Sequence, residues 1–200
     1  NGMHVLNPDL KCSALQKGET VFDTLQSFAA MGVDVMVLRH ATTGFAREAV
    51  AVLQQWPELH VINAGDGMGH HPTQALSDVF TIRQALSARQ AMLSQSAARL
   101  DWSQIQLSIV GDVRHSRVAN SLIDVLQIMG IGQINLIAPA ALLPSAEQQY
   151  AGSFVGAPGS RLQRFGDLAQ GLAGSDVVVA LRMQHERSVI DPQVLDDYQQ

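Results

Sequence analysis

The residues best suited by type and spacing to bind a small anion are His71 and Gln74, which follow the glycine-rich stretch Gly65 to Gly69. An apolar run, Leu59 to Ile62, comes before that stretch and predicts a strand, and a helical pattern opens after it at Pro72. Glycines at alternate positions permit a tight turn and a close approach of backbone to ligand. A helix start presents unpaired N–H groups and the positive end of its dipole. This segment therefore predicts a site for a small anionic substrate.

Two arginines, Arg117 and Arg182, are suited to hold a dicarboxylate, because planar guanidinium groups bind carboxylates in a bidentate way. Arg117 begins an expected helix after the turn Gly111–Asp112, and Arg182 ends an expected buried strand. Open α/β sheets place ligand groups at such positions, beyond the carboxyl ends of their strands. The competing interpretation is a surface ion pair with Asp112 or Glu186, which would add little stability.

Other candidate sites are weaker. His40, His70 and His71 lie near Asp66 in the sequence, but no histidine pair stands four residues apart on one helix, so no metal site is expected. Taken alone, a histidine at position 71 would more often be a capping or core histidine. The alternate glycines lack the order G-x-G-x-x-G and no Walker lysine follows them, so we expect no nucleotide cofactor.

Apolar runs of strand length alternate with helical patterns along the chain, which predicts parallel sheets with right-handed crossovers. We expect an α/β protein of two doubly wound parallel-sheet domains, 1–92 and 93–200, linked through the polar stretch Ser87 to Ser103. The expected strands are Met3–Leu6, Val33–Leu38, Leu59–Ile62, Gln106–Val110, Gln133–Ala138 and Asp176–Leu181. The expected helices are Val21–Ala29, Phe45–Gln54, Pro72 to about Ala88 or onward to Met92, Val118–Met129 and one near Leu162–Leu172.

Composition excludes several classes of function. The 200 residues carry a formal net charge of −5 and no long basic run, so nucleic acid and anionic membranes are not expected partners. A single cysteine, Cys12, excludes an internal disulfide and suits a reducing compartment. No apolar run reaches membrane-spanning length, and the start, Asn1 to His4, does not read as a targeting peptide. We therefore expect a cytoplasmic protein.

Five separated motifs, in order and at approximate spacing, resemble the aspartate carbamoyltransferase family, which joins carbamoyl phosphate to L-aspartate in pyrimidine synthesis. They are Lys17-Gly18-Glu19-Thr20 with Asp23-Thr24, Arg39-His40, His71-Pro72-Thr73-Gln74-Ala75-Leu76 with Asp78 and Thr81-Ile82, Gly111-Asp112 with Ser116-Arg117-Val118-Ala119 and Ser121, and Leu181-Arg182-Met183-Gln184 with Glu186-Arg187. The resemblance runs from about Met3 to about Val194. It implies a carbamoyl phosphate domain at 1–92 and an aspartate domain at 93–200, each incomplete.

The resemblance also implies roles for the matching residues in a carbamoyl transfer that needs no metal, cofactor or covalent intermediate. His71 and Arg39 would donate to the carbonyl oxygen of carbamoyl phosphate, and Gln74 would hold its amino group. Arg39 could also contact the phosphate. Arg117 would bind the α-carboxylate of aspartate, and Arg182 the β-carboxylate.

Three further residues receive roles in the same way. Gln184 would assist Arg182, while Lys17 and Ser13 would reach into the active site of a neighbouring subunit, which implies a homotrimer with shared sites. A solvated surface position is the alternative for Lys17. His185 departs from the lysine that the family most often has there, which leaves the electrostatics of that loop open. Regulatory chains or a dihydroorotase-type enzyme are further candidate partners.

The resemblance leaves other functions open. The family's Ser-Thr-Arg-Thr phosphate loop would lie before residue 1 and its closing helix beyond residue 200, so we expect these 200 residues to be inactive alone. A transcarbamylase for another amino acid, such as ornithine, would share the carbamoyl phosphate half of the site. A non-catalytic scaffold subunit is the alternative from a different functional class.

Overall fold

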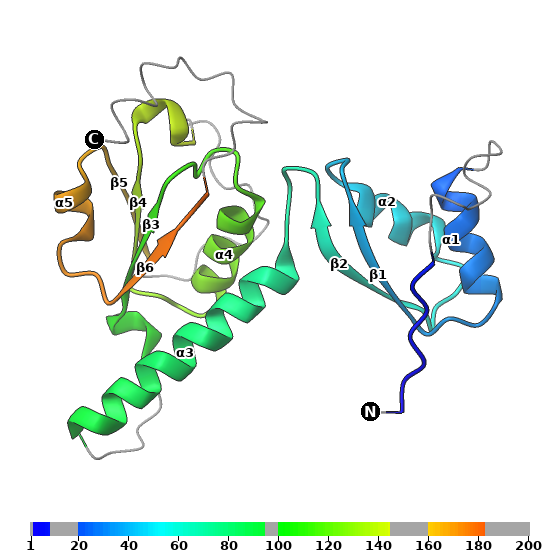
Figure 1. Cartoon of the computed structure of the whole chain (residues 1–200), viewed down its shortest axis with the longest axis horizontal. Helices are drawn as coiled ribbons and strands as arrows, with labels where there is room; N and C mark the ends of the chain where they lie inside the picture. The colour runs from blue at the N-terminus through cyan, green and yellow to red at the C-terminus, as the bar shows by residue number, and fades with distance from the viewer. Residues whose placement is uncertain (1, 9–19, 95–99, 145–159, 183–200) are drawn as a thin grey trace.

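The computed structural model of the chain describes residues 2–8, 20–94, 100–144 and 160–182. It is an α/β structure with two separate parallel sheets that lie side by side (Figure 1). The carboxyl ends of the strands of both sheets point toward the same side of the molecule, the upper side in Figure 1. The expected class, α/β with parallel sheets in two units, is therefore confirmed.

The first unit is built on two parallel strands, β1 (Val35–His40) and β2 (His60–Asp66), in which Val35 pairs with His60. Helices α1 (Val21–Ala30) and α2 (Phe45–Val52) pack on the sheet. A reciprocal capping box between Thr20 and Asp23 satisfies backbone groups at the start of α1. The two helices pack on one face of the sheet. The buried core between them and the sheet comprises Leu25, Ala29, Met36, Phe45, Ala49 and Leu53.

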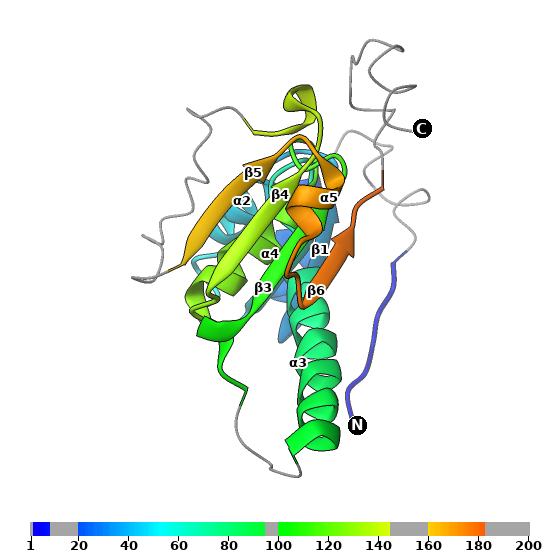
Figure 2. The ribbon, with the colours of Figure 1, turned by 90° about the vertical axis from the view of Figure 1, so that its left-hand side faces the viewer.

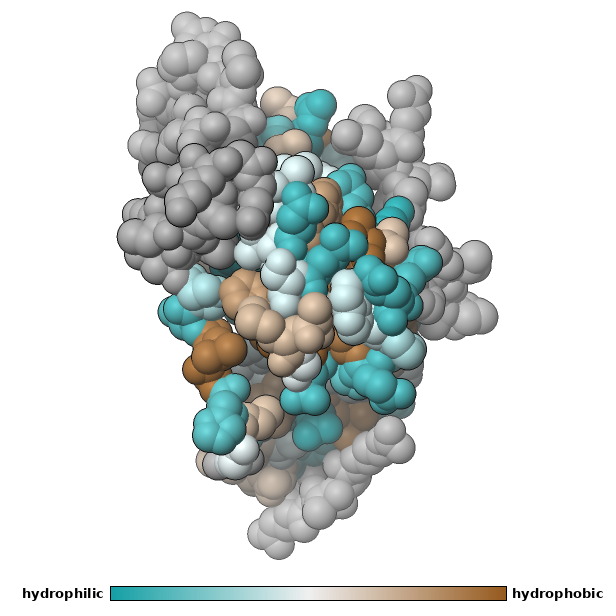
Figure 3. All heavy atoms as spheres, turned by 90° about the vertical axis from the view of Figure 1, so that its right-hand side faces the viewer, coloured by the Kyte–Doolittle hydropathy of each residue, from teal (hydrophilic) through white to brown (hydrophobic). Residues whose placement is uncertain are grey.

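The alternation of side chains along β1 explains this arrangement, because successive residues of a strand point to opposite faces. Met36 is 6% exposed, whereas its neighbour Val37 is 64% exposed. The helices therefore bury one face of the β1–β2 sheet. Figure 3 shows the outer surface of this unit, where hydrophilic residues are interspersed with smaller apolar areas.

The second unit comprises β3 (Gln106–Val110), α4 (Arg117–Ile128), β4 (Gln133–Ile137), β5 (Arg161–Phe165), α5 (Leu168–Leu172) and β6 (Val177–Ala180), with short 3-10 turns at Trp102–Gln104 and Ala140–Leu142. Its four strands are parallel, in the order β5-β4-β3-β6. Leu107 of β3 pairs with Ile134 of β4 on one side and with Val177 of β6 on the other. Figure 2 shows this sheet between α5 on one face and α4 on the other.

The long helix α3 (Pro72–Ser94) connects the two units. It contacts β2 near its start and packs along α4. Its apolar stripe, Ala75, Val79, Ile82 and Leu86, is part of the core formed by β3, β4 and α4. The helix runs through residue 92, where we placed the domain boundary, and that boundary stays a prediction.

Three expectations about elements are wrong. Met3–Leu6 forms no strand with any of the described residues, and its apolar side chains are exposed. The region Leu162–Leu172 is not one helix, since Arg161–Phe165 pairs with β4 as a strand and the helix covers only Leu168–Leu172. The expected linker Ser87–Ser103 is helical as far as Ser94, because α3 continues along the second core. The remaining expected strands and helices are confirmed to within a few residues at their ends.

Candidate active site

The candidate residues gather where the two units meet, beyond the carboxyl ends of their strands. Strand β2 leads into the loop Gly67–His71, and this loop leads into α3. On the other side, β3 leads through the turn Gly111–Ser116 into α4. Two strand-to-helix turns, one from each unit, therefore meet at this junction. Parallel α/β sheets place ligands at such turns.

Asp66 and Thr43 tie the glycine loop to the first unit. The buried carboxylate of Asp66 accepts hydrogen bonds from the backbone N–H of Gly44 at 3.2 Å and of His70 at 2.8 Å. The hydroxyl of Thr43 accepts one from the N–H of Met68 at 3.1 Å. These bonds turn the chain sharply after β2.

Gly67 allows this close approach. Its φ of +47° lies in the left-handed region, and a Cβ atom at this position would lie 2.5 Å from the backbone nitrogen of Thr43. Only glycine fits this position without displacing the backbone. The sequence prediction of a tight glycine turn is therefore confirmed at Gly67.

The protonation of His71 follows from its neighbours. Its Nδ1 accepts the backbone N–H of Gln74 at 3.4 Å, and the hydroxyl of Thr73 lies 3.2 Å from the same atom. A neutral imidazole whose Nδ1 accepts carries its hydrogen on Nε2. Burial, followed by the positive charges of Arg117 and Arg39, lowers the pKa of His71, while the charge of Asp78 opposes that change. His71 is therefore a neutral donor at physiological pH.

Gln74 and Arg39 lie on the first-unit side of the junction. The Gln74 side-chain amide donates to Asp78 Oδ1 at 2.8 Å, one turn further along α3. Arg39 is exposed near the end of β1, and its charge acts on His71. The structure thus brings His71, Gln74 and Arg39 to one region, as the sequence predicts.

One face of α4 lies against the glycine loop. Arg117 Nη1 donates to the carbonyl of Gly67 at 3.2 Å, and a Cβ atom on Gly65 would lie 3.0 Å from Arg117 Cζ. Ser121 Oγ accepts the backbone N–H of His71 at 2.9 Å. Arg117 is therefore joined to the loop that carries His71, which places the two predicted half-sites in contact.

The same face of α4 contributes two residues that sequence reasoning missed. The Asn120 amide donates to the carbonyls of Gly69 at 3.1 Å and Met68 at 3.3 Å. Asp124 Oδ2 lies 3.8 Å from His70 Nδ1. The signal was present in the sequence, because polar residues at 117, 120, 121 and 124 lie on one face of a helix.

Arg182 lies on the second-unit side, directly after β6. The N–H of Leu181 donates to the carbonyl of Val110 at 2.8 Å, which holds the end of β6 beside the end of β3. A Cβ atom on Gly111 would lie 2.9 Å from the carbonyl oxygen of Leu181, so only glycine permits this approach. The exposed Arg182 therefore lies at the same sheet edge as the turn that leads to Arg117.

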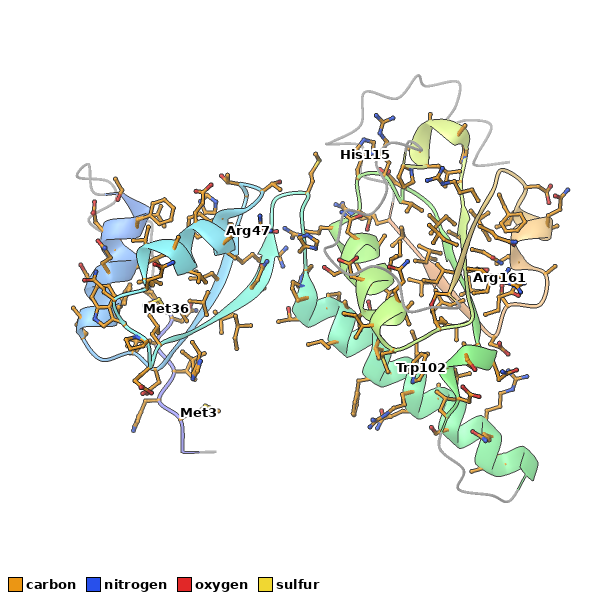
Figure 4. The ribbon with its side chains drawn as sticks, turned by 180° about the vertical axis from the view of Figure 1, so that it is seen from behind. Met3, Met36, Arg47, Trp102, His115 and Arg161 are labelled. Carbon is orange, nitrogen blue, oxygen red and sulfur yellow. The ribbon has the colours of Figure 1, made fainter. Side chains whose placement is uncertain are left out.

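Asp112 makes a contact that the sequence did not suggest. This buried carboxylate lies 2.8 Å from His115 Nδ1 and also accepts the backbone N–H of His115 at 3.2 Å. His115 stands at the upper edge of the second unit in Figure 4, at the strand-to-helix turn. The pair braces the turn that precedes Arg117.

Lys17, Ser13 and Gln184, which the sequence also proposes for the site, lie outside the described residues. Within the described ranges, no three His, Cys, Asp or Glu side chains gather closely enough to hold a metal ion. None of the helices in this part of the chain combines the length and apolarity that a membrane crossing requires.

Comparison with known proteins gives matches along nearly the whole chain. Residues 1–84 match the family described as "Aspartate/ornithine carbamoyltransferase, carbamoyl-P binding domain", and residues 103–199 match its "Asp/Orn binding domain". A protein of Coxiella burnetii named aspartate carbamoyltransferase catalytic subunit is 41% identical over 186 residues, which cover 93% of this chain and 52% of that protein.

Solved structures agree with these matches. An aspartate transcarbamoylase of Trypanosoma cruzi, in complex with carbamoyl aspartate and phosphate, has a TM-score of 0.72 and 27% identity over 97% of this chain and 56% of its own. The same enzyme in complex with N-(phosphonacetyl)-L-aspartic acid has a TM-score of 0.71 and 28% identity over 96% of this chain and 57% of its own. The chain spans about half the length of the curated relatives it matches.

Proposed function

Because the chain belongs to the aspartate/ornithine carbamoyltransferase family, we propose that its protein transfers the carbamoyl group of carbamoyl phosphate to the amino group of L-aspartate. The products are N-carbamoyl-L-aspartate and phosphate, and the reaction serves pyrimidine synthesis. The names of the Coxiella and Trypanosoma relatives support aspartate as the acceptor. We further propose a cytoplasmic homotrimer with active sites shared between subunits.

The observation that carries this proposal is the position of His71 at the junction of the two units, where the Gln74 backbone N–H donates to its Nδ1 and Arg117 holds the preceding loop. In the reaction, an uncharged amine attacks the carbonyl carbon, a C–N bond forms, and negative charge develops on the carbonyl oxygen. The C–O bond to phosphate then breaks, and the departing phosphate takes up the proton that the amine nitrogen loses. A protein accelerates such a step by orienting two anionic substrates and by aiming donors at the developing charge. The Nε2–H of His71 is such a donor, and the guanidinium charges of Arg39 and Arg117 act on the same region.

The roles of the residues divide between the two substrates. Arg39 and His71 serve the carbonyl oxygen of carbamoyl phosphate, and Gln74 serves its amino group. Asp78 supports this role, because its hydrogen bond holds the Gln74 amide in one orientation. Ser13 and Lys17 complete this half of the site from a neighbouring subunit, and Lys17 also approaches aspartate.

Arginines of the second unit serve the other substrate. Arg117 binds the α-carboxylate of aspartate, and Arg182, assisted by Gln184, binds the β-carboxylate. The position of Arg117 and Arg182 at one sheet edge supports a dicarboxylate, because two guanidinium groups can each hold one carboxylate. Ornithine lacks the second carboxylate and offers an amine in its place.

The test is carbamoyl transfer by the full-length protein, measured with labelled carbamoyl phosphate and either L-aspartate or L-ornithine. We expect product with aspartate only. Arg182→Ala should raise the KM for aspartate at least tenfold, as expected for loss of a charge-assisted pair, with little change in the KM for carbamoyl phosphate. Product with ornithine would identify the other transcarbamylase, and no product from an intact oligomer would support the scaffold alternative.

A matched control for Arg182 is Arg161, an exposed arginine at the first position of β5. It lies at the amino end of the same sheet, away from the junction (Figure 4). Arg161→Ala should therefore leave both KM values unchanged. Equal effects of the two substitutions would remove Arg182 from the aspartate pocket.

A further inference from the structure

Asn120 on α4 makes two hydrogen bonds to the loop before His71. Its side-chain amide donates to two successive carbonyls, those of Met68 and Gly69. An amide nitrogen carries two hydrogens, so one asparagine can serve both acceptors. The opposite orientation would place the amide oxygen against two carbonyl oxygens, so the hydrogen-bond pattern settles which end of the amide faces the loop.

Ties from the first unit hold the loop at other positions than the two carbonyls that Asn120 contacts. Asp66 and Thr43 hold Gly44, Met68 and His70 near the end of β1. The backbone N–H of Asp66 also donates to the carbonyl of His70 at 3.0 Å. Asn120 holds the carbonyls of Met68 and Gly69, which lie shortly before the backbone N–H of His71 that donates to Ser121.

A flanking contact extends the same face of α4 by one turn. Asp124, mostly buried, lies 3.8 Å from the ring of His70. Arg117, Asn120, Ser121 and Asp124 thus meet the loop at Gly67, Met68–Gly69, His71 and His70, respectively. The helix that supplies the proposed aspartate ligand Arg117 therefore also sets the position of the proposed carbamoyl phosphate ligand His71.

We propose that Asn120 is a positioning residue, which holds the loop Gly67–His70 so that the Nε2–H of His71 points at the reacting carbonyl oxygen. This inference rests on the proposed function for its catalytic consequence, but its structural part does not. Asn120 touches the loop backbone and acts on the substrate through His71. A shift of the donor by about 1 Å can lower a rate roughly 100-fold, so a modest displacement of the loop would be visible in turnover.

The experiment compares Asn120→Ala, Asn120→Asp and Asn120→Gln in the full-length protein. Asp keeps the size of Asn but places carboxylate oxygens against the two carbonyls, so it should be worse than Ala. Gln keeps an amide donor and should restore part of the activity. We expect kcat to fall roughly 10- to 100-fold for Ala, further for Asp and less for Gln, with little change in the KM for aspartate.

The matched control is Gln127, an amide residue two turns beyond Asn120 on α4. Its side chain makes no hydrogen bond to the described part of the chain. Gln127→Ala and Gln127→Glu remove an amide from the same helix, as Asn120→Ala and Asn120→Asp do. Both should leave kcat unchanged. Equal effects of the paired substitutions at 120 and 127 would overturn the proposal.

A second readout does not need activity. The pKa of the His71 ring can be followed by NMR titration, and it should rise toward its ordinary value in Asn120→Ala because the loop releases the ring from its site. Gln127→Ala should leave it unchanged. If the pKa of His71 in Asn120→Ala equals that of the wild type, the positioning role is overturned. Absence of carbamoyl transfer by the wild-type protein would overturn only the proposed function.

If Asn120→Ala fails to fold, the pair Asn120→Asp and Asn120→Gln carries the test. Both retain a polar side chain, and only Gln has an amide that can donate to the carbonyls of Met68 and Gly69. Equal kcat values for these two variants would contradict the proposal, whereas a clear advantage of Gln would support it.

Discussion

At the scale of single residues, the state of His71 is the property with the largest consequence. A histidine that donates from Nε2 without carrying a charge can stabilise a developing oxyanion and leave the binding of anions to arginines. In this chain the backbone N–H of Gln74 selects that tautomer, and burial together with two arginine charges disfavours protonation.

Replacement of His71 should therefore affect chemistry more than folding. We expect His71→Ala to lower kcat by about 10² to 10³-fold, the usual effect of removing one oxyanion donor, with near-native circular dichroism. His60→Ala is the control, because His60 is an exposed histidine at the amino end of β2, and it should leave kcat unchanged. A fully active His71→Ala variant would exclude His71 from the reaction.

The lowered pKa of His71 also predicts how stability depends on pH. A group whose pKa is lower in the folded state binds its proton more tightly in the unfolded chain. The free energy of unfolding should therefore fall as the pH drops below about 6.5, the ordinary histidine value. The loss should stop growing once the pH is below the lowered pKa of the folded state.

The measurement is urea unfolding at pH 7.5 and pH 5.5. His71→Gln should lose less stability between the two values than the wild type, because glutamine does not titrate. A pH dependence that is the same in both proteins would contradict the sign of the His71 shift.

At the scale of elements, the glycine loop after β2 depends on the absence of a side chain at Gly67. A Cβ atom there would meet both the hydroxyl and the backbone nitrogen of Thr43, and the backbone already has a positive φ. Gly32 also has a positive φ, +84°, but a Cβ atom would meet nothing within 4 Å. An alanine at position 32 would therefore introduce conformational strain alone, whereas one at position 67 would add steric overlap.

We expect Gly67→Ala to be the more destabilising of the two. Both variants carry a left-handed alanine, which costs about 1–2 kcal/mol, and Gly67→Ala adds an overlap that costs roughly 1–3 kcal/mol. Denaturant unfolding of both variants measures the difference. Equal free energies of unfolding would mean that the loop relaxes away from Thr43 without penalty.

At the scale of the whole molecule, α3 is the element that links the two units. It follows directly from the loop of the first unit, yet its apolar stripe lies in the core of the second. The helix therefore joins the second core to the start of α3, where His71 and Gln74 lie.

Ile82→Ala tests this assignment. Ile82 is 8% exposed, and its truncation should lower the free energy of unfolding by about 2–5 kcal/mol. Hydrogen exchange should quicken in α3, α4, β3 and β4 before it does in β1 and β2. Phe80→Ala, at a side chain on the same helix that is 54% exposed, is the control. Faster exchange confined to β1 and β2 would assign α3 to the first core.

The sequence by itself determined the α/β class, the parallel sheets, most of the elements and the motifs that place the chain in its family. It could do so because hydrophobic periodicity, glycine and proline act over a few neighbouring residues. Within that local range, the glycine turn before His71 and the helix that starts at Arg117 were both predictable.

The tertiary structure alone decided which segments pair and which side chains meet across the units. Met3–Leu6 and Arg161–Phe165 are both short segments with apolar residues, but among the described residues only the second pairs with a strand. Asn120 and Asp124 acquire a role only because α4 lies against the loop Gly67–His71. Such contacts join residues about 50 positions apart, and their free energy depends on a geometry that no local pattern encodes.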